Sequence, residues 1–388
     1  MQYATWAYPW DLLDEGVEVV ADRLIDMGIT ELNLATHYHT VQAFLPHNPE
    51  RRTFFSESAC YYQADGRYAG IEPPINDEMG EDDWVATVTD RLSETPVDCN
   101  SWTIGCHNTV LGTRHPELTQ TTAHDDDLRY ALCPSNPTVR EYLVDLLTDL
   151  DGRNAFRRIE LESFDFFDGT GFGWHHDKYH VDLGALGEFL FGLCFCDHCR
   201  ERAETAGIDV DAVRRTVRET LDRIANGRFD GDRTDVRGWL TERPAVDRYV
   251  DSRSETLRSL FERFESTVSG SDLGYYTGLL SATEQWKHGG SPETLAPHLD
   301  YLTAIAYESS REDAVAQVSE TKRLAPDARV DAGVLPGHPH VHDGETLTSI
   351  LDGLDGIGVE RVSFYNYGLL PERNLEWIET SIDAIESP

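Results

Sequence analysis

Short apolar runs alternate with longer amphipathic stretches along most of this chain. The short runs have the period of two, or the continuous apolar character, that is typical of strands, whereas the longer stretches repeat apolar residues every three or four positions, as helices do. Strands are predicted at 3–7, 31–36, 100–106, 157–162, 273–278, 301–306, 329–334 and 362–365. Helices are predicted at 14–27, 82–92, 137–152, 310–324, 343–354 and 375–385.

The helix after Asn136 has the clearest boundary signals. Asn136 is a favoured N-cap residue, Pro137 suits the first helical position, and Gly152 suits the end of a helix. Ser310 is expected to cap a second helix that runs through Leu324. These signals fix where strands and helices alternate.

Eight strands that alternate with helices favour a closed (β/α)8 TIM barrel. A doubly wound sheet would carry a glycine-rich phosphate-binding turn after its first strand, and this chain has none there. We expect a single barrel domain over 1–388, with long loops after strands two, three and four. Residues 168–270 are expected to form a helical insertion after strand four. Loops at this end of a barrel build substrate pockets.

The fourth strand places two carboxylates on one face. Glu160 and Glu162 alternate with Ile159 and Leu161, so both acids point the same way. Glu162 lies near the carboxyl end of the strand, where barrel enzymes keep their catalytic residues. Glu160 lies deeper and is expected to orient Glu162 or to pair with an arginine, because two facing carboxylates would raise one pKa sharply.

Three of the seven cysteines, Cys194, Cys196 and Cys199, fall within six positions. Three thiolates in one tight turn predict a zinc site, and an odd cysteine count argues for a reducing compartment. A tetrahedral site needs a fourth ligand from elsewhere, although His198 would strain the turn. The candidates are Cys60, Cys99, Cys106, Cys133 and His198.

Two segments of the chain resemble family 42 glycoside hydrolases, the β-galactosidase type of clan A barrel. That family places Cys-x-Cys-x-x-Cys in the loop after strand four, and its fourth zinc ligand in a segment like Tyr-Cys-Pro-x-Ser-Pro-x-Tyr-Arg before the third helix. Here residues 130–140 read Tyr-Ala-Leu-Cys-Pro-Ser-Asn-Pro-Thr-Val-Arg. The resemblance implies that Cys133 is the fourth ligand of a structural zinc and that Glu162 is the general acid/base.

The resemblance is specific over roughly 130–200 and architectural elsewhere. The family has Asn before its strand-four glutamate, where this chain has Leu161. The family also ends strand seven with a nucleophilic Glu, whereas residues 329–336 contain no Glu. These differences favour a relative of that barrel superfamily whose site differs from the family's own.

Glycoside hydrolysis requires a second carboxyl group, about 5–9.5 Å from the first. Glu308, after strand six, is expected to supply it, on the assumption that Ala304, Ala306 and Glu308 share the inward face. Asp165 and Asp331 are the reserves. The chain is thus expected to hydrolyse a glycosidic bond, with Glu162 and Glu308 as its catalytic residues.

Polar and aromatic residues gather where several strands end, which suits recognition of sugar hydroxyls. Aromatic residues near these ends also offer faces on which a sugar can stack. The expected substrate-binding residues are His37, His39, His107, Asn108, Tyr307, Tyr365 and Asn366. His175, His176 and His180, in the loop after strand four, belong to the same histidine-rich set.

Two other functions stay open. His37 and His39, with a carboxylate, could hold a catalytic metal in a barrel enzyme that acts on a free or phosphorylated sugar. Alternatively, the chain could be a carbohydrate-binding barrel that has lost its nucleophile. Metal content would separate the first alternative from a glycosidase, and the effect of Glu162→Gln would separate the second.

Charge sets the expected surroundings and partners. Asp and Glu number 70 against 33 Lys plus Arg, a formal net charge of -37, and only three residues are Lys. Such a surface suits very high salt, where repulsion is screened within about 3 Å at 1 M, so we expect a halophilic protein. It also excludes nucleic acid as a partner, because phosphate recognition needs a basic face.

The sequence has no signal-peptide pattern at its start and no apolar run near ~18 residues. We therefore expect a cytoplasmic protein without a membrane partner. A carbohydrate is the expected partner, and a homo-oligomer is compatible with barrels of this kind.

Overall fold

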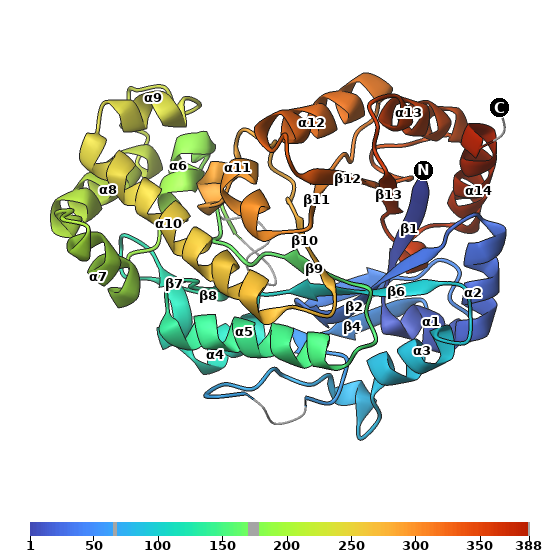
Figure 1. Ribbon diagram of the computed structural model, residues 1–388. Helices are drawn as coiled ribbons and strands as arrows, with labels where there is room; N and C mark the ends of the chain where they lie inside the picture. Colours follow the sequence, from blue (N-terminus) through green and yellow to red (C-terminus); the bar gives the residue numbers. More distant parts are fainter. Residues whose placement is uncertain (65–67, 170–177, 387–388) are drawn as a thin grey trace.

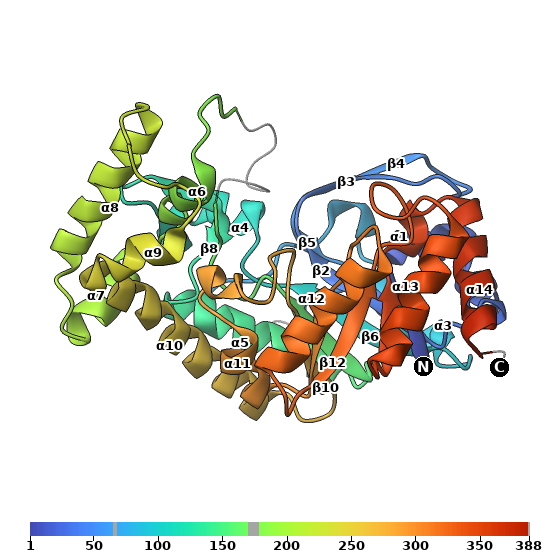
Figure 2. The same ribbon diagram turned by 90° about the horizontal axis from the view of Figure 1, so that it is seen from above.

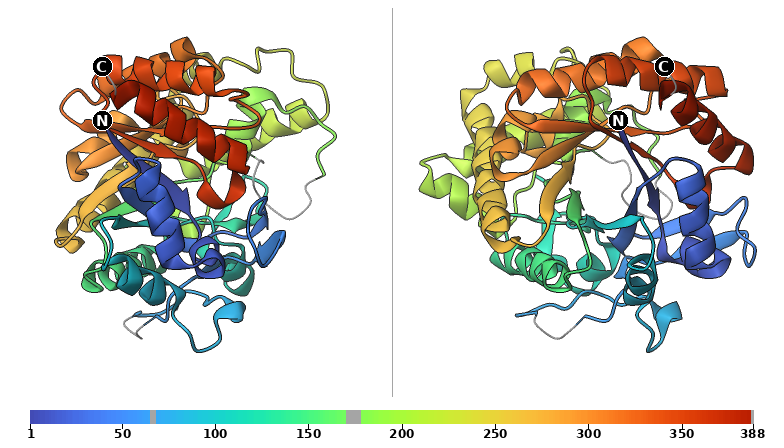
Figure 3. Two further views of the ribbon diagram at one scale, coloured as in Figure 1. Left: turned by 90° about the vertical axis from the view of Figure 1, so that its right-hand side faces the viewer. Right: turned by 45° about the vertical axis from the view of Figure 1, so that its right-hand side comes forward.

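The computed structural model describes residues 1–64, 68–169 and 178–386 and forms a closed barrel of eight parallel strands. The strands pair in the order β1-β13-β12-β11-β10-β9-β6-β2, and β1 pairs with β2 to close the ring. The barrel strands are β1 (Gln2–Ala7), β2 (Glu31–Tyr38), β6 (Asp98–Ile104), β9 (Arg158–Glu162), β10 (Asp272–Tyr276), β11 (Tyr301–Ile305), β12 (Arg329–Val334) and β13 (Arg361–Phe364). The predicted (β/α)8 fold is confirmed (Figure 1; Figure 3, right).

Helices surround the barrel and follow most of the sequence-predicted positions (Figure 3). They are α1 (Pro9–Glu15), α2 (Val17–Asp26), α3 (Trp84–Leu92), α4 (Thr109–Arg114), α5 (Pro137–Gly152), α6 (Gly184–Phe191), α7 (Asp197–Thr205), α8 (Val210–Ala225), α9 (Val236–Thr241), α10 (Pro244–Thr267), α11 (Pro292–Leu295), α12 (Arg311–Leu324), α13 (Gly344–Gly356) and α14 (Glu372–Glu386). None of the helices within the described ranges is long and apolar enough to cross a membrane.

Two expected helix caps are confirmed and one expected helix is divided. The Asn136 side chain accepts a hydrogen bond from the Thr138 amide at the start of α5, and Ser310 caps α12 in the same way. The helix predicted at 14–27 is two helices, α1 and α2. Gly16 separates them with a φ of 98°, a backbone conformation that suits glycine and interrupts a helix.

The long segment between β9 and β10 contains α6 to α10. The first four of these helices, with the start of α10, enclose a hydrophobic cluster of their own that includes Leu190, Val217 and Trp239. Helix α10 then returns beside α5, so the insertion lies to one side of the barrel (Figures 1 and 2). The boundaries 168–270 and the single-domain interpretation stay predictions.

Short strands occur in the loops after β2 and β6, where the apolar pattern predicted none. They are β3 (Val41–Phe44), β4 (Thr53–Ser56), β5 (Ala59–Cys60), β7 (Thr119–Thr121) and β8 (Asp127–Leu132). β3 pairs with β4 and β7 with β8, both antiparallel, and β5 pairs antiparallel with the end of β2. These pieces build up the rim at the carboxyl ends of the barrel strands.

A buried ion-pair network fills the amino-terminal part of the barrel interior. Arg361 Nε lies 3.0 Å from Glu31 Oε2 and its Nη1 lies 3.5 Å from Asp331 Oδ2. Arg158 Nε lies 3.2 Å from the same Glu31 oxygen. All four side chains are almost fully buried, and buried charges are tolerated only when they are paired. Asp331 therefore has a structural partner deep in the barrel, away from the rim.

We predict that Arg361→Ala lowers the free energy of unfolding by about 3–5 kcal/mol, because Glu31 and Asp331 would stay buried without its guanidinium. The matched control is Arg23→Ala, which removes an exposed pair with Glu372 and should cost about 0–1 kcal/mol. Urea titrations in molar KCl, followed by circular dichroism, measure both. Equal losses in the two variants would contradict the importance of the network.

Candidate active site

A cavity of about 1430 Å³ opens at the carboxyl ends of the barrel strands. This is the end of a (β/α)8 barrel at which active sites occur. The side chains that reach the cavity from strand ends include Tyr8, Tyr38, Trp102, Glu162, Tyr276 and Tyr365. The cavity is therefore lined by aromatic rings around a central carboxyl group.

Glu162, the last residue of β9, is partly exposed to this cavity. The Trp102 indole Nε1 donates a hydrogen bond of 2.6 Å to Glu162 Oε2. Burial raises the pKa of Glu162 to about 7, an effect that the Trp102 hydrogen bond opposes and the charges of Glu160 and Asp165 reinforce. Glu162 is thus suited to carry a proton near neutral pH.

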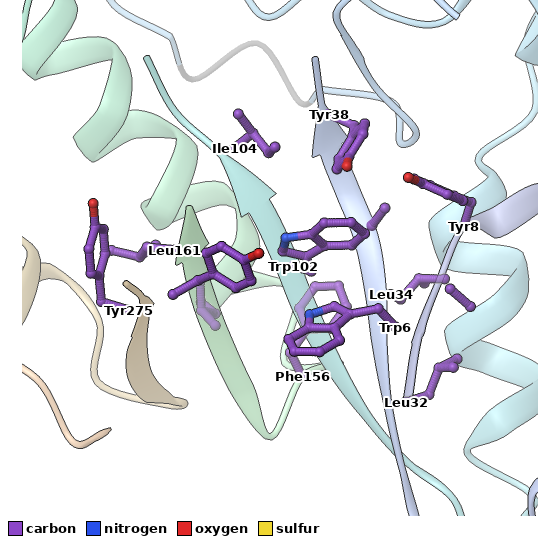
Figure 4. Close-up of a cluster of buried hydrophobic side chains, with 14 of the residues drawn as sticks. Trp6, Tyr8, Leu32, Leu34, Tyr38, Trp102, Ile104, Phe156, Leu161 and Tyr275 are labelled. Atoms are coloured by element: carbon purple, nitrogen blue, oxygen red, sulfur yellow. The ribbon is translucent and has the colours of Figure 1, made fainter. Parts of the chain in front are cut away.

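Glu160 lies one layer below Glu162 on the same inward face of β9. It accepts a hydrogen bond of 2.9 Å from Trp6 Nε1 and one of 2.5 Å from Thr303 Oγ1. Figure 4 shows Trp6 and Trp102 one above the other, with their indole nitrogens on the side of β9. Trp6 and Trp102 therefore each position the side chain of one of the two glutamates. The prediction that Glu160 and Glu162 share the inward face is confirmed.

The inward face assumed for strand six is wrong. Thr303 points to the barrel axis, where it bonds Glu160, so its neighbours Ala304 and Ala306 face outward. Glu308 was expected to share the face of these two alanines. Because they face outward, this alternation does not bring Glu308 to the interior. Glu308 lies beyond β11, is half-buried and does not line the cavity. The structure brings Glu162 together with Asp165 instead of Glu308.

Asp165 lies three residues after Glu162 and lines the same cavity. Tyr275 Oη donates a hydrogen bond of 2.5 Å to Asp165 Oδ2, and His288 Nδ1 lies 3.4 Å from that oxygen. Burial alone would lower the pKa of His288, but the Asp165 carboxylate raises it above its ordinary value. Asp165 thus accepts a hydrogen bond from a phenol and lies beside an imidazole, whereas the nearest described partner of Glu162 is the Trp102 indole.

Four of the seven predicted substrate-binding residues line the cavity: His39, His107, Tyr307 and Tyr365. The rings of His39 and His107 stack with centroids 4.6 Å apart, and burial lowers the pKa of His39. Tyr365 Oη lies 3.3 Å from Tyr38 Oη, within a group of phenols that faces Glu162. These groups can bind hydroxyl groups and stack on a sugar.

His37 does not reach the cavity. The register of β2 shifts between Ala35 and His37, and this irregularity turns the His37 side chain to the outer face of the sheet. There Nδ1 lies 2.6 Å from the Ile104 carbonyl oxygen and Nε2 lies 3.3 Å from Tyr142 Oη of α5. Burial lowers the pKa of His37 to about 4, so the ring stays neutral and structural.

Asn108 and Asn366 also lie outside the cavity lining, because both act as helix caps. The Asn108 side chain accepts a hydrogen bond of 2.8 Å from the Leu111 amide at the start of α4. Asn366, fully buried, accepts one of 3.2 Å from the Gly368 amide in a short 3-10 turn. The sequence pattern could not separate these capping amides from amides that bind a ligand.

Within the described part of the chain, the alternative metal site of His37, His39 and a carboxylate is not assembled. Among the described residues, the only group of three or more His, Cys, Asp or Glu ligand atoms close enough for one ion is the cysteine cluster. His37 contacts Tyr142 of α5, whereas His39, just beyond β2, lines the cavity, and among the described residues the two do not form a ligand group with a carboxylate. His175 and His176 lie outside the described residues, and His180 is exposed.

Cys133, Cys194, Cys196 and Cys199 form that cluster, with sulfur atoms all within 4.8 Å of one another. The Cys133 sulfur lies 3.5, 3.7 and 3.5 Å from those of Cys199, Cys194 and Cys196, respectively. A tetrahedral ion with metal–sulfur bonds of about 2.3 Å requires sulfurs about 3.8 Å apart, which these separations approach. The cluster therefore fits a single metal ion and joins the start of α5 to the insertion.

Several groups at the site were not recognised from the sequence. The alternation of residues along its strand indicates that the Trp102 side chain points inward. The pattern of one strand, however, does not show which residue of another strand accepts the hydrogen bond of the indole N–H. His288 lies in a loop without periodicity, and no local signal connects it to Asp165. The sequence indicates Asp165 only as a reserve candidate for the second carboxyl group, because its neighbours Tyr275 and His288 are more than a hundred residues away in the chain.

Comparison with known proteins supports the fold. No protein-family model and no curated protein sequence matches this chain. Among solved structures, the PgaB (BpsB) glycoside hydrolase domain from Bordetella bronchiseptica is similar, with a TM-score of 0.61, 12% identity, and 98% of each chain covered.

Two β-galactosidases are similar to the same degree. The polyextremophilic enzyme from the Antarctic haloarchaeon Halorubrum lacusprofundi has a TM-score of 0.63 at 10% identity, over 100% of this chain and 58% of that one. The enzyme from the psychrophilic Marinomonas ef1 has a TM-score of 0.59 at 12% identity, over 99% and 60%. The chain thus spans about three fifths of these β-galactosidases, and at such identities the likeness establishes a shared barrel fold.

Proposed function

We propose that this protein is a glycoside hydrolase whose catalytic pair is Glu162 and Asp165. The observation that carries the proposal is that two carboxyl groups share one open cavity and have different hydrogen-bond partners. Burial raises the pKa of Glu162 to about 7, while Tyr275 donates a hydrogen bond to Asp165 and His288 lies beside it. Glycosidases need such a pair, one group as the acid and the other as the carboxylate.

In this mechanism Glu162 donates its proton to the glycosidic oxygen as the bond from that oxygen to the anomeric carbon breaks. The sugar develops positive charge, which the ionised Asp165 stabilises. Asp165 then meets the anomeric carbon directly or takes a proton from the water that attacks it. The Trp102 indole N–H, 2.6 Å from Glu162, steadies the negative charge that Glu162 acquires.

The aromatic lining supports a carbohydrate as the substrate. Tyr38, Tyr276, Tyr307 and Tyr365 surround Glu162 and combine apolar ring faces with hydroxyl groups. Such side chains can stack on a sugar ring and also bind its hydroxyls. His39 and His107 add imidazole nitrogens at the same rim.

The cysteine cluster is proposed to hold a structural zinc. A closed set of four thiolates leaves no open position on the ion, as in other structural zinc sites. The Thr121 amide N–H points to the Cys194 sulfur at 3.4 Å, a contact of the kind that orients a metal-bound sulfur. The ion would fix the insertion against the barrel, and the acidic surface is proposed to suit molar salt.

The catalytic pair predicts a specific pattern of losses. In molar KCl, with a panel of aryl glycosides and oligosaccharides, Glu162→Gln and Asp165→Asn should each lower kcat by about 10²–10⁴, because each removes one half of the acid/base chemistry. Glu308→Gln is the matched control and should stay within about twofold of wild type, because Glu308 does not line the cavity. Loss of activity in Glu308→Gln with retention in Asp165→Asn would reverse the assignment.

The pH dependence follows from the raised pKa of Glu162. A general acid works only when protonated, so kcat/KM should fall about tenfold per pH unit above the pKa of about 7 in the free enzyme. A rate that stays constant up to pH 9 would show that Glu162 is not the acid.

Zinc content tests the cluster. Purified wild-type protein should contain one zinc per chain by elemental analysis, and Cys133→Ser should lose that zinc and melt at a lower temperature, because the closed tetrahedral site loses a ligand. Cys99→Ser is the control, since Cys99 is a buried thiol outside the cluster. Equal zinc content in Cys133→Ser and wild type would exclude Cys133 as a ligand.

A further inference from the structure

Large apolar side chains are exposed at the mouth of the cavity. The most exposed in the described part of the chain are Phe44, Phe55, Val19 and Leu279, at 64%, 62%, 62% and 60%, respectively. Three of these four, Phe44, Phe55 and Leu279, line the cavity, and only Val19 lies elsewhere, on α2. In a chain with a net charge of -37, this concentration at one place marks a binding surface.

Two of these exposed side chains, Phe44 and Phe55, lie on the β3–β4 hairpin, whose other face packs against the protein. Ala43 pairs with Phe54 across the hairpin, and Phe54 is buried, stacked on Trp10 with centroids 4.0 Å apart. Phe44 and Phe55 occupy the opposite face as diagonal neighbours, about 7–8 Å apart in an antiparallel pair. One face therefore anchors the hairpin, whose two strands are seen in Figure 2, and the other face carries the two phenyl rings that line the cavity.

The second side of the mouth is formed by the loop after β10. Leu279 and Leu280 line the cavity from there, while the hairpin lines it from the loop after β2. Glu162 and Asp165 lie in the same continuous cavity. A ligand that contacts the rim and the carboxyl pair together must therefore be extended.

The size of the cavity supports this conclusion. Its volume of about 1430 Å³ exceeds the roughly 300–1,000 Å³ typical of pockets for drug-sized molecules. A single sugar ring would fill only a part of this volume. Apolar ring faces with no hydrogen-bonding groups suit the C–H faces of sugar rings beyond the one that is cleaved.

We propose that the site acts on a linear oligosaccharide of several sugar units, whose remote units stack on Phe44 and Phe55 and contact Leu279. This inference rests on the proposed function in taking the ligand to be a carbohydrate. The continuity of the rim with the cavity at Glu162 favours a glycan over a second copy of this chain, which would cover the rim without entering the cavity. Phe44 and Phe55 are then specificity residues for chain length.

The test uses Glu162→Gln as a binding scaffold, so that hydrolysis does not consume the ligand. Calorimetric titrations in molar KCl use linear galactose, glucose, xylose and mannose oligosaccharides of one to six units. For at least one series, affinity should rise about tenfold or more from dimer to pentamer. Adding Phe44→Thr and Phe55→Thr should abolish this rise and leave dimer affinity unchanged, since burial of one large apolar side chain is worth about that factor. Threonine keeps the strand propensity of the hairpin.

The matched control adds Val19→Thr to the same scaffold, because Val19 is equally exposed on α2, and it should bind the pentamer like the scaffold. The inference is overturned if no series binds, if affinity is independent of length, or if the double phenylalanine variant binds the pentamer normally. It is also overturned if that variant changes only the oligomeric state. If the wild type hydrolyses a glycoside but binding does not depend on chain length, the proposed function stands and the inference on chain length fails. If binding depends on chain length but the wild type hydrolyses nothing, the proposed glycosidase function fails and the inference on chain length stands.

Discussion

The inward face of β9 is the constraint on which the site depends. Arg158, Glu160 and Glu162 follow one another along the barrel axis, so three ionisable groups must be accommodated in a largely buried column. Arg158 pairs with Glu31 in the lowest layer, and Glu160 is satisfied by Trp6 and Thr303 in the middle layer. Of these three side chains, only the uppermost, Glu162, lines the cavity, where its carboxyl group can contact a ligand.

The layers below Glu162 therefore determine its chemistry. Burial contributes most to the raised pKa of Glu162, and the charges of Glu160 beneath it and of Asp165 beside it add to this effect. Asp165 has partners of a different kind, because Tyr275 and His288 reach it from the β10 side of the barrel. Two acids that are three residues apart in sequence thus have different hydrogen-bond partners, because different elements surround them.

Local patterns in the sequence were enough to predict the barrel. Strand parity placed Glu160 and Glu162 on one face, and Asn136 and Ser310 marked helix starts, because these signals act within a few residues. The contacts that define the site are not local.

The structure supplied three things that no local pattern contained. The register shift in β2 turns His37 outward, and the inward position of Thr303 fixes the parity of β11. Asp165 depends on partners from β10 and the loop after it. Each of these depends on pairing between distant segments, which periodicity within one segment does not encode.

The most direct test of the account is a crystal structure of the Glu162→Gln protein with the intact glycoside that the wild type cleaves fastest. The account predicts that the glycosidic oxygen lies about 2.6–3.2 Å from the side chain at position 162, with Asp165 facing the anomeric carbon. A glycoside bound elsewhere, or one whose glycosidic oxygen is remote from position 162, would contradict it, as would the absence of any cleaved glycoside.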